Sequence, residues 1–206
     1  MTECSLTKYL GAGGASAFIA AILLTLGGSS EALAQVQQTL PVVQAVVTQV
    51  TPAQFLSTLP VTTAPAVAPL DALVDAQSAG SALDDEGQCL ATAVYFESMG
   101  EPLQGQLAVA NVVINRARSG RYPASWCGVV KQKAQFSFVH NGHFPRIDAA
   151  CQAWRKAQAI ARIASANLAQ ALPGDVLWYH ADYVAPSWGR RLTKVEKIGA
   201  HIFYRA

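Results

Sequence analysis

The stretch QCLATAVYFESMGEPLQGQLAVANVVINRAR, residues 88–118, contains the two helices around which the rest of the chain is expected to fold. Its second half, residues 103–118, is apolar on nearly every face, which is typical of a central buried helix. The pair Glu101-Pro102 places a proline in the first turn of that helix, and Gly120 ends it. The stretch therefore predicts two consecutive helices, the second of them inside the core.

One acidic residue lies on the apolar side of the first helix. The apolar stripe of this helix consists of Leu90, Ala93 and Val94. Glu97 continues the stripe at the same helical spacing, so its carboxyl group is expected on the core side. The helix C-terminus is electronegative and the aromatic neighbours exclude water, and both effects raise the pKa of a carboxyl group. Glu97 is therefore a candidate general acid, and the alternative is an acid that reaches solvent or pairs with an arginine.

Four positions at helical spacing form a line along the helix over residues 103–118: Gln104, Ala108, Asn111 and Asn115. A polar line on an otherwise apolar helix either faces solvent or lines a cleft. In the second case the cleft would bind a ligand rich in hydroxyl and amide groups. The residues alone leave both alternatives open.

The rest of the sequence predicts more helix and, late in the chain, a small sheet. The expected elements are a short helix over 125–132, a long helix over 148–168, a strand over 175–180 and a hairpin with strands over 191–197 and 200–205. Ser125 and Asp148 are suited to be the N-caps of the two helices. The pattern therefore predicts a mostly α fold of the α+β class with a small late hairpin or sheet.

An uncharged segment at residues 9–28 is followed by Ala32 and Ala34, which are placed for signal-peptidase cleavage before Gln35. Residues 1–34 are therefore predicted to be an export signal, which puts the rest of the protein in the periplasm or at the cell wall. An uncleaved anchor in the inner membrane is the alternative, because the segment is long enough to span a bilayer. We expect no other contact with a membrane.

The composition changes again after the predicted signal. Residues 35–82 are rich in Gln, Val, Thr, Ala and Pro, and the prolines interrupt any helical or strand period. This segment is predicted to be a largely disordered linker. Residues 83–206 are then long enough for one folded domain with a single core, which we take as the catalytic domain.

Charge is distributed unevenly along the chain. Of the 15 Lys and Arg residues and the 13 Asp and Glu residues, residues 1–83 contain one and four. The remaining part has a modest positive excess, which suits weak attraction to an anionic polymer such as a bacterial wall. It does not indicate nucleic acid, where clustered basic stripes are expected. The basic residues of the central region are interpreted as solvated charges: Arg116, Arg118, Arg121, Lys131 and Lys133.

A set of short motifs occurs in one order between residues 89 and 205. It consists of Glu97, Gly100-Glu101-Pro102, Gly105-Gln106, Ala108-Val109-Ala110, Asn115-Arg116, Pro123, Gln135-Phe136-Ser137, Trp154, His180, Trp188, Gly199, His201 and Phe203-Tyr204. This ordered set resembles the SleB-like cell-wall hydrolase family, which includes the spore-cortex-lytic enzymes. The resemblance implies a lysozyme-like, mostly helical fold that acts on the glycan strands of peptidoglycan, with Glu97 as the catalytic residue. We expect no cofactor, no bound metal and a monomeric protein.

The pair Glu97-Ser98 at the helix end is also similar to the Glu-Ser pair of lytic transglycosylases. Those enzymes need one glutamate, because muramic acid supplies its own hydroxyl group as the nucleophile and a 1,6-anhydromuramoyl end results. A two-carboxylate glycosidase needs a second acid across the bond. Glu101 is the possible second carboxylate here, but Gly100 and Pro102 interrupt the helix that would align it. We therefore favour cleavage between muramic acid and glucosamine by the single-acid route.

The resemblance also suggests which residues bind the sugar chain: Gln106, Asn115, Gln135, Phe136, Ser137, His180 and Trp188. Gln135, Phe136 and Ser137 would form a wall of aromatic and hydrogen-bonding groups, and Trp188 would offer a stacking face. Core packing is the alternative for Phe136 and Trp188. A structural role is the alternative for His180.

Cysteines are compatible with export, because an exported domain can hold disulfides. Cys4 would be lost with the signal, which leaves Cys89, Cys127 and Cys151. Many members of the family that the chain resembles carry two further cysteines near the Gln-Phe-Ser motif, and this chain lacks both. We expect a disulfide between Cys89 and Cys127, with Cys151 free and buried on its helix.

Three other functions compete with glycan cleavage. An N-acetylmuramoyl-L-alanine amidase or wall peptidase with zinc would use His140 and His143 together with His180 or His201 and Asp182. A thiol peptidase would use Cys89 or Cys127 with a histidine. The third alternative is a peptidoglycan-binding module without turnover.

Overall fold

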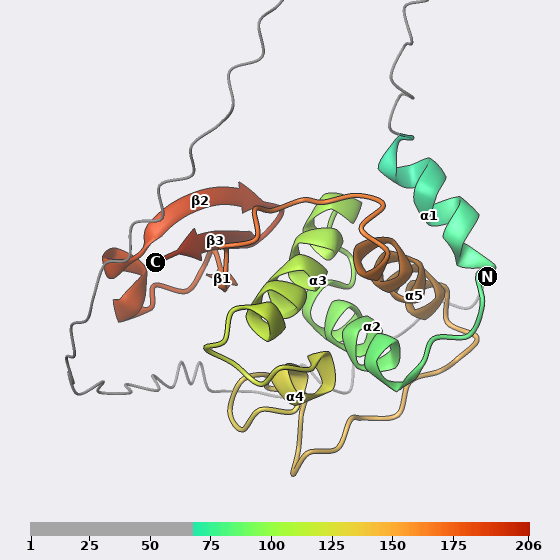
Figure 1. Cartoon of the computed structure of the whole chain (residues 1–206), viewed down its shortest axis with the longest axis horizontal. Helices are drawn as coiled ribbons and strands as arrows, with labels where there is room; N and C mark the ends of the chain where they lie inside the picture. Colours follow the sequence, from blue (N-terminus) through green and yellow to red (C-terminus); the bar gives the residue numbers. More distant parts are fainter. Residues whose placement is uncertain (1–67) are drawn as a thin grey trace, which may run out of the picture. The chain divides into compact units, whose positions relative to one another are not determined.

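Two consecutive helices form the centre of the fold (Figure 1). In the computed structural model, which describes residues 68–206, α2 spans Asp85–Ser98 and α3 spans Leu103–Arg118. Residues 105–116 of α3 are all buried, because helices cover one side of α3 and the sheet covers the other. The prediction of a central buried helix is confirmed.

Three more helices pack around this pair. They are α1 at Leu70–Ser78, α4 at Trp126–Val130 and α5 at Gln152–Ser165. α5 contacts both central helices, and α1 lies along α5. Ser125 caps α4, as expected, because its hydroxyl group accepts a hydrogen bond from the Gly128 N–H. The apolar side chains of all five helices form the main core.

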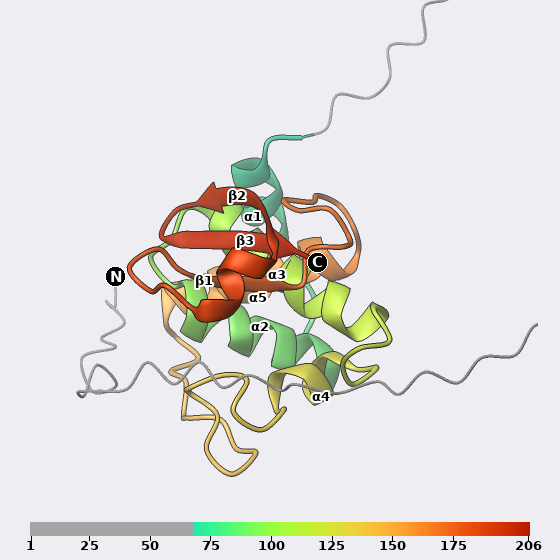
Figure 2. The ribbon, with the colours of Figure 1, turned by 90° about the vertical axis from the view of Figure 1, so that its left-hand side faces the viewer.

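A three-stranded antiparallel sheet follows the helices in the chain. β1 spans Trp178–Ala181, β2 spans Thr193–Ile198 and β3 spans His201–Arg205, and β3 lies between the other two. A short 3-10 helix, η1 at Ser187–Arg191, precedes β2. Figure 2, in which the sheet faces the viewer, shows β3 crossing in front of the helices. Gly199 makes the β2–β3 turn with a φ of 57°, a conformation that glycine adopts without steric cost.

These elements agree with the fold class predicted from the sequence. The mostly α architecture with a small late sheet is confirmed, and the late hairpin lies where the pattern places it. A second, smaller core forms where α3 meets the sheet, with Val112 and Phe203 fully buried at its centre. The sheet is therefore attached to the helical part mainly through α3.

Helix α1 lies inside the segment predicted to be a disordered linker. That prediction is wrong for residues 70–78, because the leucine and valine side chains of this helix pack against the main core. The prolines that favoured a linker end at Pro69, which occupies the N-cap position of α1. The rest of the predicted linker and the predicted export signal lie outside the described residues. Within residues 68–206, every helix is too short or too polar to cross a lipid bilayer.

Helix α5 starts later than predicted. Its first residue is Gln152, with Cys151 at the N-cap position. Asp148 accepts a hydrogen bond from the Ala150 N–H through its side chain and from the Cys151 N–H through its carbonyl group. Asp148 therefore stabilises a turn ahead of the helix instead of capping it. Side chains of this type favour both arrangements, so the sequence did not distinguish them.

Two side chains of the polar line on α3, those of Asn111 and Asn115, form hydrogen bonds to backbone groups of the loop before β1. Asn111 Oδ1 accepts hydrogen bonds from the N–H groups of residues 171–172. Asn115 Nδ2 donates to the carbonyl groups of Pro173 and Val176 at 2.9 and 3.1 Å. Both alternatives considered for these two asparagines, solvent and cleft, are therefore wrong. Because buried loop backbone needs partners from elsewhere, the two side chains fix the segment between α5 and β1.

A disulfide joins two helices of the helical part. Cys89 of α2 is bonded to Cys127 of α4, which is the pair expected from the sequence. Cys151 is buried and is disulfide-bonded as well, so the expectation of a free thiol is wrong. A thiol nucleophile would need one of these sulfur atoms as a thiolate, and a disulfide does not supply it.

Replacing Asn115 with Ala is expected to destabilise the fold by about 1 to 3 kcal/mol, because the carbonyl groups of Pro173 and Val176 lose their donor. The matched control is Gln104→Ala, at the exposed end of the same line, with an expected change below about 0.5 kcal/mol. The free energy of unfolding in urea checks both values. Similar effects of the two substitutions would contradict the role assigned to Asn115.

Candidate functional site

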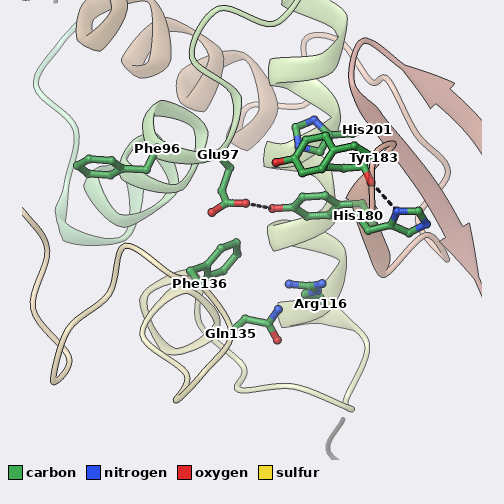
Figure 3. A pocket seen from close by; sticks show the side chains of 10 residues that line it. Phe96, Glu97, Arg116, Gln135, Phe136, His180, Tyr183 and His201 are labelled. Atoms are coloured by element: carbon green, nitrogen blue, oxygen red, sulfur yellow. Dashed lines mark hydrogen bonds between the residues drawn. The ribbon is translucent and has the colours of Figure 1, made fainter. Parts of the chain in front are cut away.

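A pocket of about 330 Å³ lies where the end of α2, the end of α3 and the sheet meet. Its lining residues are Phe96, Glu97, Arg116, Gln135, Phe136, Tyr179, His180, Ala181, Tyr183 and His201. Figure 3 shows Glu97 on α2, Arg116 on α3 and Gln135 after α4 around the same space. The volume is in the range of sites that bind small molecules or single sugar units.

Glu97 is the carboxyl group of this pocket. It lies in the last turn of α2, where the pocket leaves it partly exposed while protein surrounds the rest of the side chain. The Tyr179 hydroxyl group donates a hydrogen bond to Glu97 Oε2 at 3.0 Å (Figure 3). Loss of solvent raises the pKa of Glu97, while the Tyr179 hydrogen bond and the Arg116 charge lower it by less. Glu97 therefore keeps its proton to higher pH than an exposed glutamate does.

Tyr179 on β1 connects the sheet to Glu97. Burial and the charge of Glu97 raise the pKa of Tyr179 well above its ordinary value, so the hydroxyl group stays a hydrogen-bond donor at neutral pH. The ring packs against His201 and Phe203 of β3, with centroid distances of 5.2 and 5.6 Å. These contacts fix the ring, and the fixed hydroxyl group in turn orients the Glu97 carboxyl group.

Arg116 is a buried part of the site. It is 3% exposed, and its Nε donates a hydrogen bond to the Leu177 carbonyl group at 2.7 Å. The guanidinium group lies over the rings of Tyr122, Phe136 and Tyr179, at 5.1, 6.0 and 5.8 Å from their centroids. The interpretation of Arg116 as a solvated charge is therefore wrong. A cation that follows a long apolar run in the same helix was the sequence signal that could have identified it.

Two histidines line the side of the pocket formed by the sheet. His180 Nδ1 lies 2.8 Å from the Ala181 carbonyl oxygen, and its Nε2 lies 2.9 Å from the Tyr204 hydroxyl group. Because a carbonyl group only accepts, Nδ1 carries the hydrogen. Burial lowers the pKa of His201, so this ring is neutral at neutral pH. His201 Nδ1 has no hydrogen-bond partner within residues 68–206.

Four of the residues predicted for the site line the pocket: Glu97, Gln135, Phe136 and His180. Phe136 is also buried in the main core, where its ring contacts that of Phe138, so both interpretations of this residue apply. His180 holds Tyr204 in addition to facing the pocket. The sequence motif Gln-Phe-Ser thus brings two of its three residues to the acid.

The other residues predicted to bind sugar have different places. Ser137 is exposed and does not line the pocket. Trp188 packs edge-to-face against His180 and Tyr204, away from the pocket lining. Gln106 is buried and donates to the Glu101 carbonyl group at 2.9 Å, and Asn115 holds the loop before β1. Gln106 and Asn115 therefore use their amide groups for hydrogen bonds to backbone, because residues 105–116 of α3 are buried.

Glu101 is absent from the pocket lining in the described part of the chain. Its Oε2 accepts a hydrogen bond from the Ala200 N–H at 2.9 Å, so the carboxylate holds the turn between β2 and β3. Among the described lining residues, Glu97 is the single acid. The site therefore presents one carboxyl group to a ligand.

Five lining residues besides Arg116 were not predicted to bind the substrate: Phe96, Tyr179, Ala181, Tyr183 and His201. Tyr183 is 86% exposed and lies in the loop after β1, so it offers an open aromatic face beside the pocket. An aromatic residue in or after a strand is more often part of a core, and the local pattern does not give its direction. Pairing of β1 with β3 decides which side chains reach the pocket.

The loop with His140 and His143 does not assemble a metal site. The two residues pair through their backbones, and both are exposed. In the part of the chain that the structure describes, no three His, Cys, Asp or Glu side chains come together as metal ligands would. The zinc alternative therefore has no donor set to support it among these residues.

The fold and the site together define a mostly helical domain in which one partly buried carboxyl group, held by a tyrosine, faces a polar pocket. The sequence profile of the cell wall hydrolase family matches residues 100–204, which is half of the chain. The protein belongs to this family. Glu97 lies just before the matched segment, so its role is argued from the pocket.

Curated relatives agree with this assignment. The chain is 33% identical over 147 residues to the spore cortex-lytic enzyme of Bacillus subtilis strain 168, a match that covers 68% of this chain and 44% of that protein. It is 33% identical over 119 residues to the spore cortex-lytic enzyme of Oceanobacillus iheyensis, covering 56% and 40%. The chain therefore spans about two fifths of the length of the curated relatives it matches.

A solved structure shares the fold. The catalytic domain of the germination-specific lytic transglycosylase SleB from Bacillus anthracis is 31% identical, with a TM-score of 0.50. The match covers 61% of this chain and 98% of that domain. The SleB catalytic domain is a lysozyme-like α+β domain, so the fold expected from the resemblance is confirmed.

Glu97→Gln is expected to raise the stability of the fold at pH 7. The raised pKa means that the folded chain binds this proton more tightly than the unfolded chain does. The carboxyl group therefore favours the folded state fully below its ordinary pKa of 4.5, and this contribution is lost as the pH rises through the raised value. The stability difference between variant and wild type should be larger at pH 7 than at pH 4.

Urea unfolding midpoints at the two pH values measure this difference. Glu196→Gln, which removes an exposed acid from β2, is the control for a general change in net charge. A difference that is equal at pH 4 and pH 7 would show that burial does not perturb the carboxyl group of Glu97.

Proposed function

We propose that this protein cleaves the glycan strand of peptidoglycan between muramic acid and glucosamine as a lytic transglycosylase, with Glu97 as its single catalytic acid. The observation that carries the proposal is one carboxyl group with a raised pKa, held by Tyr179 in a pocket. The names of its relatives support it, since they include spore cortex-lytic enzymes and a lytic transglycosylase.

In the proposed reaction Glu97 first acts as an acid and then as a base. Its proton goes to the oxygen of the glycosidic bond, and that bond breaks as the leaving sugar takes up the electron pair. The C6 hydroxyl group of the muramic acid then attacks C1 of the same sugar and passes its proton to the Glu97 carboxylate. A 1,6-anhydromuramoyl end forms, and Glu97 regains its proton without water entering the reaction.

The surroundings of Glu97 suit both halves of this cycle. Loss of solvent raises the pKa and keeps the proton available for the first step. The Tyr179 hydroxyl group and the Arg116 charge act in the opposite direction and stabilise the carboxylate that the first step leaves behind. A group that must donate and then accept a proton needs such opposing influences, because an extreme pKa would block one of the two steps.

Simple hydrolysis with two carboxylates receives less support. Such enzymes place the second carboxyl group about 5 to 9.5 Å from the first. Glu101 is occupied at the β2–β3 turn, and among the described pocket-lining residues Glu97 is the single acid. The single-acid route requires no further carboxylate.

A non-catalytic wall-binding module is the alternative that fits the same pocket without chemistry. It shares the expected ligand, peptidoglycan, and differs in turnover.

We also propose that the protein works as a monomer outside the cytoplasm, in the periplasm or at the wall, on the basis of the predicted export signal and of the expected substrate.

Glu97→Gln is expected to reduce glycan cleavage by about 10² to 10⁴ fold, because an amide does not donate a proton as a carboxyl group does. Retention of the Tyr179 hydrogen bond by the amide oxygen should leave binding of peptidoglycan within a few fold. The full chain is incubated with purified peptidoglycan, and the soluble products are analysed by mass. Wild type should yield muropeptides with anhydro ends.

Glu101→Gln is the matched control for this experiment. Its amide oxygen can still accept from the Ala200 N–H, so activity within a few fold of wild type is expected. A loss as large as that of Glu97→Gln would favour two carboxylates, and reducing-end products would favour hydrolysis. Binding without any products from wild type would favour the wall-binding module.

Tyr183→Ala is expected to raise the KM for glycan strands by about five fold with little change in kcat, because an exposed ring beside the pocket is suited to stack on a sugar. Leu168→Ala is the control, since Leu168 is the other large exposed apolar side chain in residues 68–206 and lies off the pocket. Steady-state release of soluble fragments gives both parameters. An unchanged KM would remove Tyr183 from the binding surface.

A further inference from the structure

Arg116 has a hydrogen-bonding group that the protein leaves unused. Its Nη1 is buried and has no hydrogen-bond partner within residues 68–206, whereas its Nε is bound to the Leu177 carbonyl group. A buried donor without a partner costs folding free energy, so such a group in a native structure calls for a functional or structural explanation. Arg116 itself lines the pocket, so a bound ligand lies beside its guanidinium group (Figure 3).

Within residues 68–206, Arg116 also forms no salt bridge with an acidic side chain. The ion pairs in the described part of the chain join Lys197 to Asp182 and Arg205 to Asp175, far from this helix in sequence. Three aromatic rings surround the guanidinium group and partly stabilise it. When Glu97 holds its proton, as a proton donor must, the described pocket lining contains no negative charge. A ligand with an anionic group would complete the site.

The chemistry of the substrate offers one such group beside the bond that is cut. Muramic acid carries a lactyl ether on C3, two ring atoms away from the C1 at which the glycosidic bond breaks. In peptide-bearing strands the lactyl group is a neutral amide. After the peptide is removed it is a carboxylate, which a guanidinium group binds more strongly through charge-assisted hydrogen bonds.

We propose that Arg116 binds the free lactyl carboxylate of a muramoyl residue and thereby selects glycan strands from which the peptides have been removed. This inference rests on the proposed function for the identity of the ligand. It also places the protein in a reaction sequence: a hydrolysis of the amide bond between muramic acid and its peptide must come first. The unused donor and the guanidinium charge then both have their partner in one ligand group.

The first test compares two ligands that differ only at the lactyl carboxyl group, which is charged in one and a neutral amide in the other. N-acetylmuramic acid and its lactyl methylamide are titrated against the full chain, and the dissociation constants are measured by calorimetry. Wild type is expected to bind the acid about ten fold more tightly than the amide. Equal affinities would overturn the proposal, and this comparison needs no variant.

Variants then assign the preference to a residue. Arg116→Gln should bring the ratio of the two affinities close to one, and Arg116→Lys should leave a reduced preference because it keeps the charge and loses the planar donor pair. Arg118→Gln, which removes an exposed arginine from the same helix, is the matched control and should keep the wild-type ratio. A preference that survives Arg116→Gln would overturn the proposal.

A crystal structure of the wild-type chain with N-acetylmuramic acid covers the case in which the variants do not fold. The lactyl carboxylate is expected within hydrogen-bond distance of the Arg116 guanidinium group. A carboxylate bound elsewhere would overturn the proposal.

Cleavage assays separate this inference from the proposed function. Wild type is incubated with peptide-free strands and with peptide-bearing strands, and anhydro ends are quantified. Faster cleavage of the peptide-free strands supports both proposals. Equal cleavage overturns the inference and leaves the proposed function intact. No cleavage of either substrate, together with a measured preference for the acid in binding, overturns the proposed function and leaves the anion site in place.

Discussion

The hydrogen bond from Tyr179 to Glu97 joins the two parts of the molecule at the point where the chemistry is proposed. Glu97 ends α2 in the helical part, and Tyr179 lies on β1 in the sheet. The bond has a donor–acceptor distance of 3.0 Å, and partial burial of both side chains strengthens it relative to a fully solvated one. The direction and the protonation of the acid therefore depend on how the sheet is docked.

Helix α3 provides that docking. Asn111 and Asn115 hold the loop that leads into β1, and Arg116 holds the next residue of the same segment through the Leu177 carbonyl group. Three successive hydrogen-bonding side chains on one helix thus fix the strand that carries Tyr179. This arrangement explains why the buried helix α3 contains these polar residues. Each of the three side chains supplies a hydrogen-bond partner that the loop backbone lacks.

The electrostatics of the pocket come from a balance between neighbours. Desolvation favours the neutral form of Glu97, and the nearby guanidinium group favours its ionised form. An ordinary ion pair between the two would hold the acid ionised and end its use as a proton donor. Tyr179 binds the carboxyl oxygen instead, and the Arg116 Nη1 has no hydrogen-bond partner within residues 68–206. Because Glu97 and Arg116 do not form an ion pair, Glu97 can keep its proton and Arg116 can bind the anionic group of a ligand.

The sequence by itself determined the elements and the acid. Apolar periodicity predicted α2, α3 and the late hairpin, because burial of one face imposes a repeat that is visible in one dimension, and the same repeat pointed Glu97 inward. Tertiary structure decided what each polar side chain meets. Arg116, Asn115 and Glu101 have ordinary local contexts, and their partners lie tens of residues away at 177, 173–176 and 200. Contacts of that range depend on the packing of the sheet against α3, and no local spacing records them.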